Sequence, residues 1–248
     1  CGGDPALRAA VDRLLLAHDR EDAAAAAPPT RGEAGRNGAA DADRPGADLP
    51  PTIGPYELGP VLGEGGFGVV VRARQRAPLV RDVAIKVSKP GRDGAAVLRR
   101  FEIERDALAR MSHPGIAAVL DAGRLPDGRP YVVMELVDGE PITDFAHRRG
   151  LSVRARVALV ARVCRAIHHA HQRAVIHRDV KPSNVLVVEQ DGEPRPRVID
   201  FGIARALGPG VEAGRTRAGD LLGTPRYMSP EQLVAGGTTD VRTDVHGL

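Results

Sequence analysis

The stretch "HRDVKPSN", residues 177–184, concentrates ionisable and amide side chains directly after the apolar run "AVI". Asp179 and Asn184 lie five positions apart, a spacing that lets both side chains face one site from a loop. Asp200 follows sixteen residues after Asn184, at the end of the apolar segment "RVID". Carboxylate and amide oxygens are the hard ligands that Mg²⁺ prefers when phosphates complete its coordination. These residues therefore predict a site for a divalent cation and a phosphate-bearing ligand.

A glycine-rich segment upstream supplies a second element that can contact phosphates. "GEGGFGVV" (63–70) places Gly63, Gly65 and Gly68 in the spacing G-x-G-x-x-G. That spacing alone is weak evidence, because dinucleotide-binding folds use it at a turn from a strand into a helix. Here the following "VVVRARQ" has the pattern of a strand, which favours a hairpin whose backbone N–H groups approach phosphates. An ordinary glycine-rich hairpin is the alternative when the segment is taken by itself.

A lysine on the next predicted strand is the third element. Lys86 ends "VAIK" (83–86) and is one of only three lysines in the chain. A solvent-exposed strand lysine is the ordinary alternative. A lysine that binds phosphates needs an acidic partner, and the predicted helix 95–111 offers Glu102 and Glu104. We expect Glu104 to be the partner because it precedes an apolar residue by four positions on the helical repeat, whereas Glu102 is expected to face solvent.

The composition is that of a globular protein, with 42% hydrophobic and 27% charged residues among 248. A net charge of +3 and an aromatic content of 3% give no support for nucleic-acid binding. Cys1 and Cys164 are too far apart for a disulfide framework or a metal site, so we expect a reducing, cytoplasmic environment. No apolar run approaches the ~18 residues of a membrane span; a tether in regions outside this sequence stays open. Because the chain starts with Cys, we expect a fragment of a longer protein, with a lipidated N-terminus as the alternative.

Changes in composition divide the chain into three regions. Residues 1–20 form a short helical extension, with apolar residues at helical spacing. Residues 21–52 consist almost entirely of Ala, Gly, Pro, Asp and Arg, which predicts a disordered linker. From Ile53 onward, strands dominate as far as "RPYVVMELV", and helices follow, with short strands expected around "VIHR" (175–178), "VLVV" and "RVID". This order predicts two lobes with a cleft between them.

The combination of "GEGGFGVV", "VAIK", "HRDVKPSN", "DFG" and "SPE" resembles the protein kinase superfamily, specifically the bacterial eukaryotic-like (Hanks-type) Ser/Thr kinases. The resemblance covers residues 53–248 and implies an α+β, bilobal fold. We expect a small five-stranded N-lobe with one helix (53–134), a hinge (135–138) and a helical C-lobe (139–248) that is incomplete. The segment before the linker is similar to extensions ahead of kinase domains in planctomycete-type proteins.

The resemblance implies a role for each polar residue around a bound ATP and its Mg²⁺ or Mn²⁺ ions. Lys86 is expected to hold the α- and β-phosphates and to be held by Glu104. Asp200 and Asn184 are the expected metal ligands. Asp179 is expected to orient the substrate hydroxyl, and Lys181, which marks the Ser/Thr pattern, is expected to reach the γ-phosphate. His177 and Phe201 are expected to pack rather than to act as an acid and a base.

The same resemblance predicts the walls of the nucleotide site. Val70 and Ala84 are expected above the adenine and Leu186 below it, with Met134 as the gatekeeper. Glu135 and Val137 belong to the hinge, whose backbone is expected to bind the adenine edge. The glycine-rich residues expected over the phosphates are Gly63, Glu64, Gly65, Gly66, Phe67 and Gly68.

Regulation is also implied by the resemblance. Arg178 precedes Asp179 and is expected to bind an anion such as a phosphate on the activation segment, with Thr216 as the expected autophosphorylation site. Thr224 is expected in the substrate loop, in contact with Asp179 and Lys181. We expect Thr216→Ala to lower activity.

Two residues near the end of the chain have expected structural roles in the family. Asp244 is expected to brace the backbone of "HRD", and Glu231 to pair with an arginine from a later helix that is absent here. A buried carboxylate without its partner is costly. We therefore expect the 248-residue chain to fold poorly and to be weakly active or inactive.

The sequence leaves two alternatives to a protein kinase and names its partners only by class. A pseudokinase or nucleotide-binding scaffold is disfavoured because Lys86, Asp179, Asn184 and Asp200 are all present. A small-molecule phosphotransferase is disfavoured by the substrate platform "GTPRYMSPE". The expected partners are ATP and proteins that carry Ser or Thr acceptors. A kinase–kinase dimer for autophosphorylation in trans is compatible with the resemblance.

Overall fold

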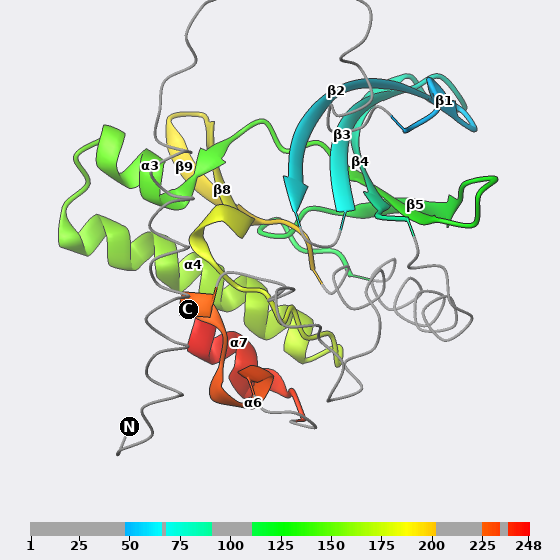
Figure 1. The fold of residues 1–248 in the computed structure, drawn as a ribbon. Helices are drawn as coiled ribbons and strands as arrows, with labels where there is room; N and C mark the ends of the chain where they lie inside the picture. The colour runs from blue at the N-terminus through cyan, green and yellow to red at the C-terminus, as the bar shows by residue number, and fades with distance from the viewer. Residues whose placement is uncertain (1–47, 66–67, 91–110, 202–224, 234–237) are drawn as a thin grey trace, which may run out of the picture.

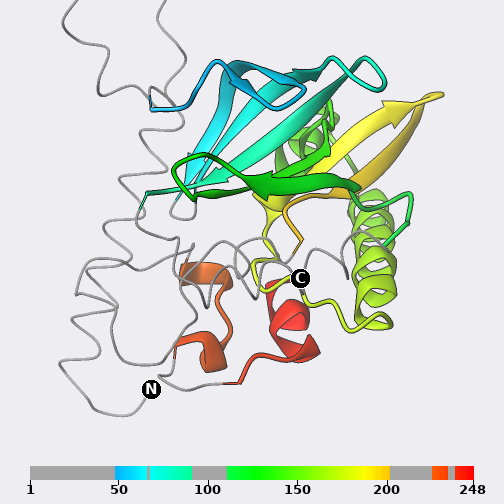
Figure 2. The same ribbon diagram turned by 90° about the vertical axis from the view of Figure 1, so that its right-hand side faces the viewer.

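The computed structural model describes residues 48–65, 68–90, 111–201, 225–233 and 238–248. Figures 1 and 2 show a large β-sheet at the top of the molecule with a smaller sheet beside it, a long helix below the smaller sheet, and short helices at the bottom. The predicted division into a strand-rich first part and a helix-rich second part is confirmed.

The six-stranded sheet has the order β1-β2-β3-β4-β6-β5, with neighbouring strands antiparallel. One strand more is present than the five expected, because Thr52 and Ile53 pair with the start of the next strand. Ile53 is buried there among the side chains of the inner face. The strands are β1 (Thr52–Ile53), β2 (Tyr56–Gly65), β3 (Gly68–Gln75), β4 (Arg81–Ser88), β5 (Val119–Arg124) and β6 (Pro130–Glu135).

The second part of the chain combines a small antiparallel sheet with helices. The sheet has the order β7-β8-β9, from β7 (Glu140–Pro141), β8 (Val185–Gln190) and β9 (Glu193–Val198). The α-helices are α3 (Ile142–Arg148), α4 (Val153–His171), α6 (Pro230–Leu233) and α7 (Val241–Gly247), and two 3₁₀ turns are η1 (Pro182–Asn184) and η2 (Pro225–Tyr227). In the part of the chain that the structure describes, none of the helices has the length and apolar character needed to cross a membrane.

Helix α4 packs against β9 of the smaller sheet. It begins at Ser152, whose hydroxyl oxygen accepts a hydrogen bond from the backbone N–H of Ala155 at 3.3 Å, a standard N-cap. Its apolar residues recur at helical spacing and are buried toward β9 and the loop before β8. The buried positions are Leu159, Val163, Ala166, Ile167 and Ala170.

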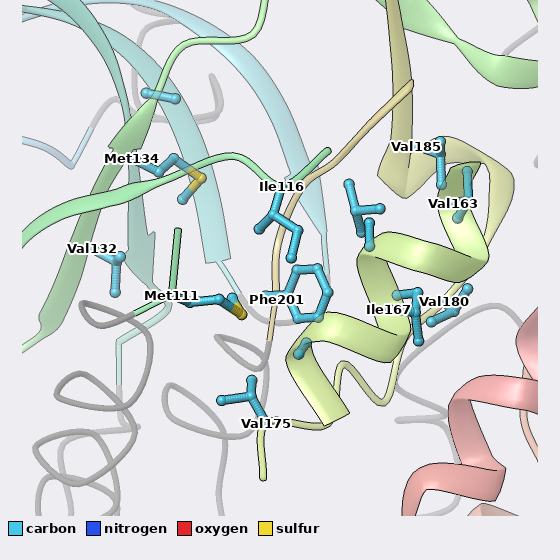
Figure 3. Packing of buried hydrophobic residues seen from close by; sticks show 14 residues of the cluster. Met111, Ile116, Val132, Met134, Val163, Ile167, Val175, Val180, Val185 and Phe201 are labelled. Atoms are coloured by element: carbon cyan, nitrogen blue, oxygen red, sulfur yellow. The ribbon is translucent and has the colours of Figure 1, made fainter. Parts of the chain in front are cut away.

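One apolar cluster joins the two parts of the molecule. Figure 3 shows Phe201 at its centre, between Met111 and Ile116 on one side and Ile167 of α4 on the other. Met134 of β6 belongs to the same cluster. Phe201 is 3% exposed, and burial of an aromatic side chain of this size stabilises a fold by about 1.5–3 kcal/mol. This packing brings the end of β9 beneath β4 and β6.

One predicted strand is wrong, and two predicted helices lie outside the described residues. Residues 175–178, "VIHR", form no strand, because the backbone N–H groups of His177 and Arg178 bond to the carboxylate of Asp244 instead of to a neighbouring strand. The expected helical extension at 1–20 and the expected helix at 95–111 fall on residues that the structure does not describe, apart from Met111.

Candidate active site

A buried ion pair joins the upper sheet to the segment after β9. The ammonium of Lys86 lies 2.8 Å from Oδ2 of Asp200, although the two residues are 114 positions apart. Their side chains are 10% and 20% exposed. Lys86 is held in the middle of the sheet, between Val70 of β3 and Val132 of β6. Asp200 has a positive φ of 63°, an uncommon conformation that Asp tolerates better than most residues.

The loop between α4 and β8 gathers the second set of polar groups. The ammonium of Lys181 lies 2.9 Å from Oδ2 of Asp179. The side-chain amide of Asn184 donates to the same oxygen at 3.0 Å and to the backbone carbonyl of Asp179 at 2.7 Å. Asn184 is held by the 3₁₀ turn η1 at the start of β8. Since its Nδ2 atom bonds within the loop, its Oδ1 atom is the one that suits an electropositive ligand.

His177 occupies a packing position beneath this loop. The ring is fully buried, and its Nε2 donates to the carbonyl of Ile199 at 2.9 Å. Its Nδ1 accepts from the backbone N–H of Asp179 at 3.3 Å. The ring also contacts Phe201, with centroids 4.7 Å apart. Because both ring nitrogens are engaged inside the fold, these contacts agree with packing and not with acid–base chemistry.

Asp244 of α7 fixes the backbone of the same loop. Its carboxylate accepts hydrogen bonds from the backbone N–H groups of His177 at 2.8 Å and Arg178 at 2.6 Å. The ring of His171, at the end of α4, lies 2.7 Å from the same carboxylate. Asp244 is 0% exposed. The expectation that Asp244 braces the loop is confirmed.

Glu231 and Arg178 have partners in the described part of the chain. The hydroxyl of Thr243 donates to Glu231 at 2.7 Å. That hydrogen bond, with contributions from the backbone N–H of Glu231 and from Ser229, lowers the pKa of the Glu231 carboxyl. The guanidinium of Arg178 donates to the hydroxyl of Thr239 at 3.3 Å. Glu231 therefore joins α6 to α7, and Arg178 joins the loop to the segment just before α7.

The glycine-rich segment is a hairpin between β2 and β3, as predicted from the sequence. Gly63 pairs with Val70, and Gly65 pairs with Gly68. A Cβ atom at Gly68 would lie 2.1 Å from the carbonyl oxygen of Val87, so only glycine fits where β3 meets β4. On the outside of the hairpin, a salt bridge of 2.8 Å joins Glu64 to Lys89.

The apolar residues predicted to line the adenine lie on β3, β4, β6 and β8. Ala84 of β4 is paired with Met134 of β6, and both are buried in the joining cluster, against which Val70 packs. Leu186 is partly buried on β8.

A salt bridge joins the end of β6 to β9. Glu135 bonds to the guanidinium of Arg197 and accepts from the backbone N–H of Ala118 at 3.2 Å. The same guanidinium donates to the carbonyl of Ile116 at 3.2 Å.

The donor set suits a divalent cation that is bound together with phosphates. Asp200 and Asn184 offer a carboxylate and an amide oxygen, both of which are hard ligands. Among the described residues, no group of three or more His, Cys, Asp or Glu side chains could hold a metal on its own. When Mg²⁺ binds together with a nucleotide, phosphate oxygens usually complete such a ligand set.

Comparison with known proteins agrees with this geometry. The family model of the protein kinase domain matches residues 56–248. The chain belongs to the protein kinase family. The predicted membership of this superfamily and the predicted α+β kinase fold are confirmed.

The similar proteins are bacterial kinases. The chain is 42% identical over 201 residues to the serine/threonine-protein kinase PknB of Mycolicibacterium smegmatis, covering 78% of this chain and 31% of that protein. It is 43% identical over 202 residues to the DNA damage-responsive serine/threonine-protein kinase RqkA of Deinococcus radiodurans, covering 79% and 28%. The crystal structure of the Mycobacterium tuberculosis PknI kinase domain superposes with a TM-score of 0.60 at 30% identity, covering 79% and 71%. The chain thus spans less than a third of the length of these two curated relatives.

The kinase structure brings together most of the residues predicted from the sequence. Lys86 and Asp200 meet at one point, and Asp179, Lys181 and Asn184 meet at another. Five predicted residues lie outside the described part of the chain, and their contacts stay predictions: Gly66, Phe67, Glu104, Thr216 and Thr224.

Three residues that shape the kinase site were missed by the sequence analysis. His171 contacts Asp244, Arg197 contacts Glu135, and Gln232 donates to the backbone carbonyl of Arg178 at 2.7 Å. The only signal for His171 was its place at the end of the apolar repeat of α4. Nothing in the sequence distinguishes Arg197 from the other arginines, or Gln232 from a surface glutamine.

Proposed function

We propose that this chain carries the catalytic domain of a bacterial Ser/Thr protein kinase, which transfers the γ-phosphoryl group of ATP to Ser or Thr hydroxyls with Mg²⁺ or Mn²⁺. The observation that carries the proposal is the convergence of distant polar groups. Lys86 lies 2.8 Å from Asp200, and Asn184 lies 3.0 Å from the carboxylate of Asp179. Phosphoryl transfer depends mainly on positioning and charge neutralisation, and these groups offer both a positive charge and oxygen ligands for cations.

Each side chain has a proposed role in that reaction. Lys86 would bind the α- and β-phosphates, and Asp200 and Asn184 would hold the divalent ions, which neutralise charge on the phosphates when bound. Asp179 would orient the acceptor hydroxyl and take its hydrogen bond. Lys181, 2.9 Å from Asp179, would reach the γ-phosphate. The glycine-rich hairpin and the apolar wall would enclose the rest of the nucleotide.

The proposal extends to the organisation and regulation of the protein. We propose an N-lobe of residues 53–134, a hinge of 135–138 and a C-lobe that begins at 139, preceded by the extension 1–20 and the linker 21–52. Phosphorylation of Thr216, with Arg178 as the anion-binding residue, is the proposed switch. Protein substrates, a kinase–kinase dimer and a cytoplasmic location also belong to the proposal.

The test is a phosphotransfer assay on the complete protein with labelled ATP, Mg²⁺ and a panel of protein and small-molecule acceptors. We expect transfer to proteins only, with phosphate on Thr216 by mass spectrometry. Asp179→Asn should lower kcat by about 10²- to 10⁴-fold, the contribution of a positioned acid or base. ATP binding without transfer to any acceptor would instead show a nucleotide-binding scaffold. Transfer only to small molecules would overturn the assignment to protein kinases.

A further inference from the structure

The peptide unit that joins Arg178 to Asp179 is fixed at both of its edges. Its carbonyl oxygen accepts a hydrogen bond of 2.7 Å from the side-chain amide of Gln232. Its N–H, which belongs to Asp179, donates to the ring of His177 at 3.3 Å. The orientation of this peptide sets the direction in which the Asp179 side chain leaves the backbone.

The backbone at Arg178 needs such support. Arg178 has a φ of 66°, in the left-handed region that residues other than glycine rarely adopt. A conformation of this kind persists only when the surrounding structure determines it. The N–H of Arg178 is held by the carboxylate of Asp244 at 2.6 Å, and the carbonyl of the same residue is held by Gln232. Asp244 and Gln232 therefore act on opposite ends of one strained residue.

Gln232 is itself positioned for this contact. Its Oε1 accepts from the backbone N–H of Ser229 at 2.9 Å and from the Ser229 hydroxyl at 3.3 Å. These bonds use the oxygen of the side-chain amide and leave the nitrogen directed at the loop. Gln232 and Arg178 are 54 positions apart in sequence. The side chain thus connects α6 to the loop that contains the catalytic aspartate.

We propose that Gln232 is a positioning residue for phosphoryl transfer: its amide N–H holds the Arg178–Asp179 peptide in the orientation that aims the Asp179 carboxylate at the acceptor hydroxyl. This inference rests on the proposed kinase function. The hydrogen bonds of Gln232 go to Ser229 and to the backbone of Arg178, so its effect on the reaction would pass through Asp179. Since displacement of a reacting group by about 1 Å can cost about 100-fold in rate, loss of the bond should lower kcat more than it affects ATP binding.

The decisive variant is Gln232→Glu in the complete protein. Glutamate has the same shape and still accepts from Ser229, but it has no N–H for the carbonyl of Arg178 and places a negative charge against it. We expect kcat to fall about 10- to 100-fold while KM for ATP changes by less than about 2-fold. Amide hydrogen exchange at residues 177–180 should become faster. Gln190→Glu, at the exposed end of β8, is the matched control and should behave like the unmodified protein.

A second variant covers the case in which the new charge disturbs folding. Gln232→Met keeps the length of the side chain without adding charge, and it should show the same selective fall in kcat. The proposal is overturned if both variants turn over like Gln190→Glu, or if kcat, KM for ATP and melting temperature all deteriorate together, as for general destabilisation. Absence of phosphotransfer by the unmodified protein would overturn the kinase function itself, and is recognised because no variant then has a rate to lose.

Discussion

The catalytic loop (residues 177–184) and the glycine hairpin (residues 63–65 and 68–70) border the proposed nucleotide site but are held in different ways. In the loop, side chains from α6 and α7 bond to the backbone, His171 of α4 bonds to the Asp244 carboxylate, and Asp244 is 0% exposed. In the hairpin, strand pairs with strand, residues 63–65 are exposed, and the register of the two strands shifts twice just before Gly63. The described loop is fixed by polar side chains that bond to its backbone, whereas the described hairpin is fixed by backbone pairing, with its first strand exposed and Gly68 to Val70 buried or partly buried.

This difference matches what each element must do in a kinase. A residue that orients an acceptor hydroxyl must be placed to within a fraction of an ångström, because misplacement is costly in rate. A cover over phosphates has to admit and release a nucleotide, and exposed backbone hydrogen bonds with few buried contacts are typical of segments that open at low cost. Loss of a buried hydrogen bond to the loop backbone should therefore lower the free energy of unfolding far more than loss of any side-chain contact in the hairpin.

Removal of the Asp244 carboxylate should lower the free energy of unfolding more than the other substitutions discussed below. Asp244→Ala would leave the buried N–H groups of His177 and Arg178 without acceptors and His171 without its partner. We expect the free energy of unfolding to fall by about 3–5 kcal/mol, measured by denaturant unfolding. Asp240→Ala is the control on the same helix, because Asp240 caps the exposed start of α7 and such a cap is worth about 1 kcal/mol. Equal losses for both variants would contradict a special role for the buried carboxylate.

Removal of the salt bridge between Glu135 and Arg197 should cause an intermediate loss of stability. Arg197→Met removes the salt bridge to Glu135 and the hydrogen bond to the carbonyl of Ile116. Since the Glu135 side chain is 37% exposed, water replaces part of the interaction, and we expect a loss of about 1 kcal/mol. Arg195→Met, at an exposed position of the same strand, should cost close to nothing. A loss at Arg195 as large as that at Arg197 would mean that the ion pair contributes no stability.

The residues proposed to bind the ligand were easier to predict from the sequence than the residues that hold them in place. Lys86, Asp179, Asn184 and Asp200 stand in local motifs with characteristic spacing, so their convergence could be predicted without coordinates. The prediction of Asp244 came from the family resemblance.

Residues that support the site through distant contacts could not be predicted in the same way. Gln232 reaches its partner across 54 positions and Arg197 reaches Glu135 across 62, and neither side chain stands in a local pattern. The failed strand at 175–178 has the same origin, since its apolar run has strand character but a carboxylate from α7 takes its N–H groups. Tertiary partners of this kind leave no periodic signal.

The salt bridge between Glu64 and Lys89 should contribute the least to the free energy of unfolding. Their side chains are 36% and 41% exposed, and exposed pairs contribute about 0–1 kcal/mol. We expect a double-mutant cycle of Glu64→Gln and Lys89→Met to give a coupling of no more than about 0.5 kcal/mol in unfolding. The coupling should vanish when salt rises from about 0.05 M to about 0.5 M, because the ions screen exposed charges.

A coupling above about 1 kcal/mol that survives high salt would change the comparison between the two elements. Such a result would mean that a desolvated ion pair between Glu64 and Lys89 holds the outer edge of the hairpin. Asp244 holds the catalytic loop in a similar way. Nucleotide entry would then have to break that pair, and Lys89→Met would accelerate ATP binding. With a weak, screened pair, the association rate for ATP should instead be the same in Lys89→Met and in the unmodified protein at high salt, since backbone pairing alone then holds the hairpin.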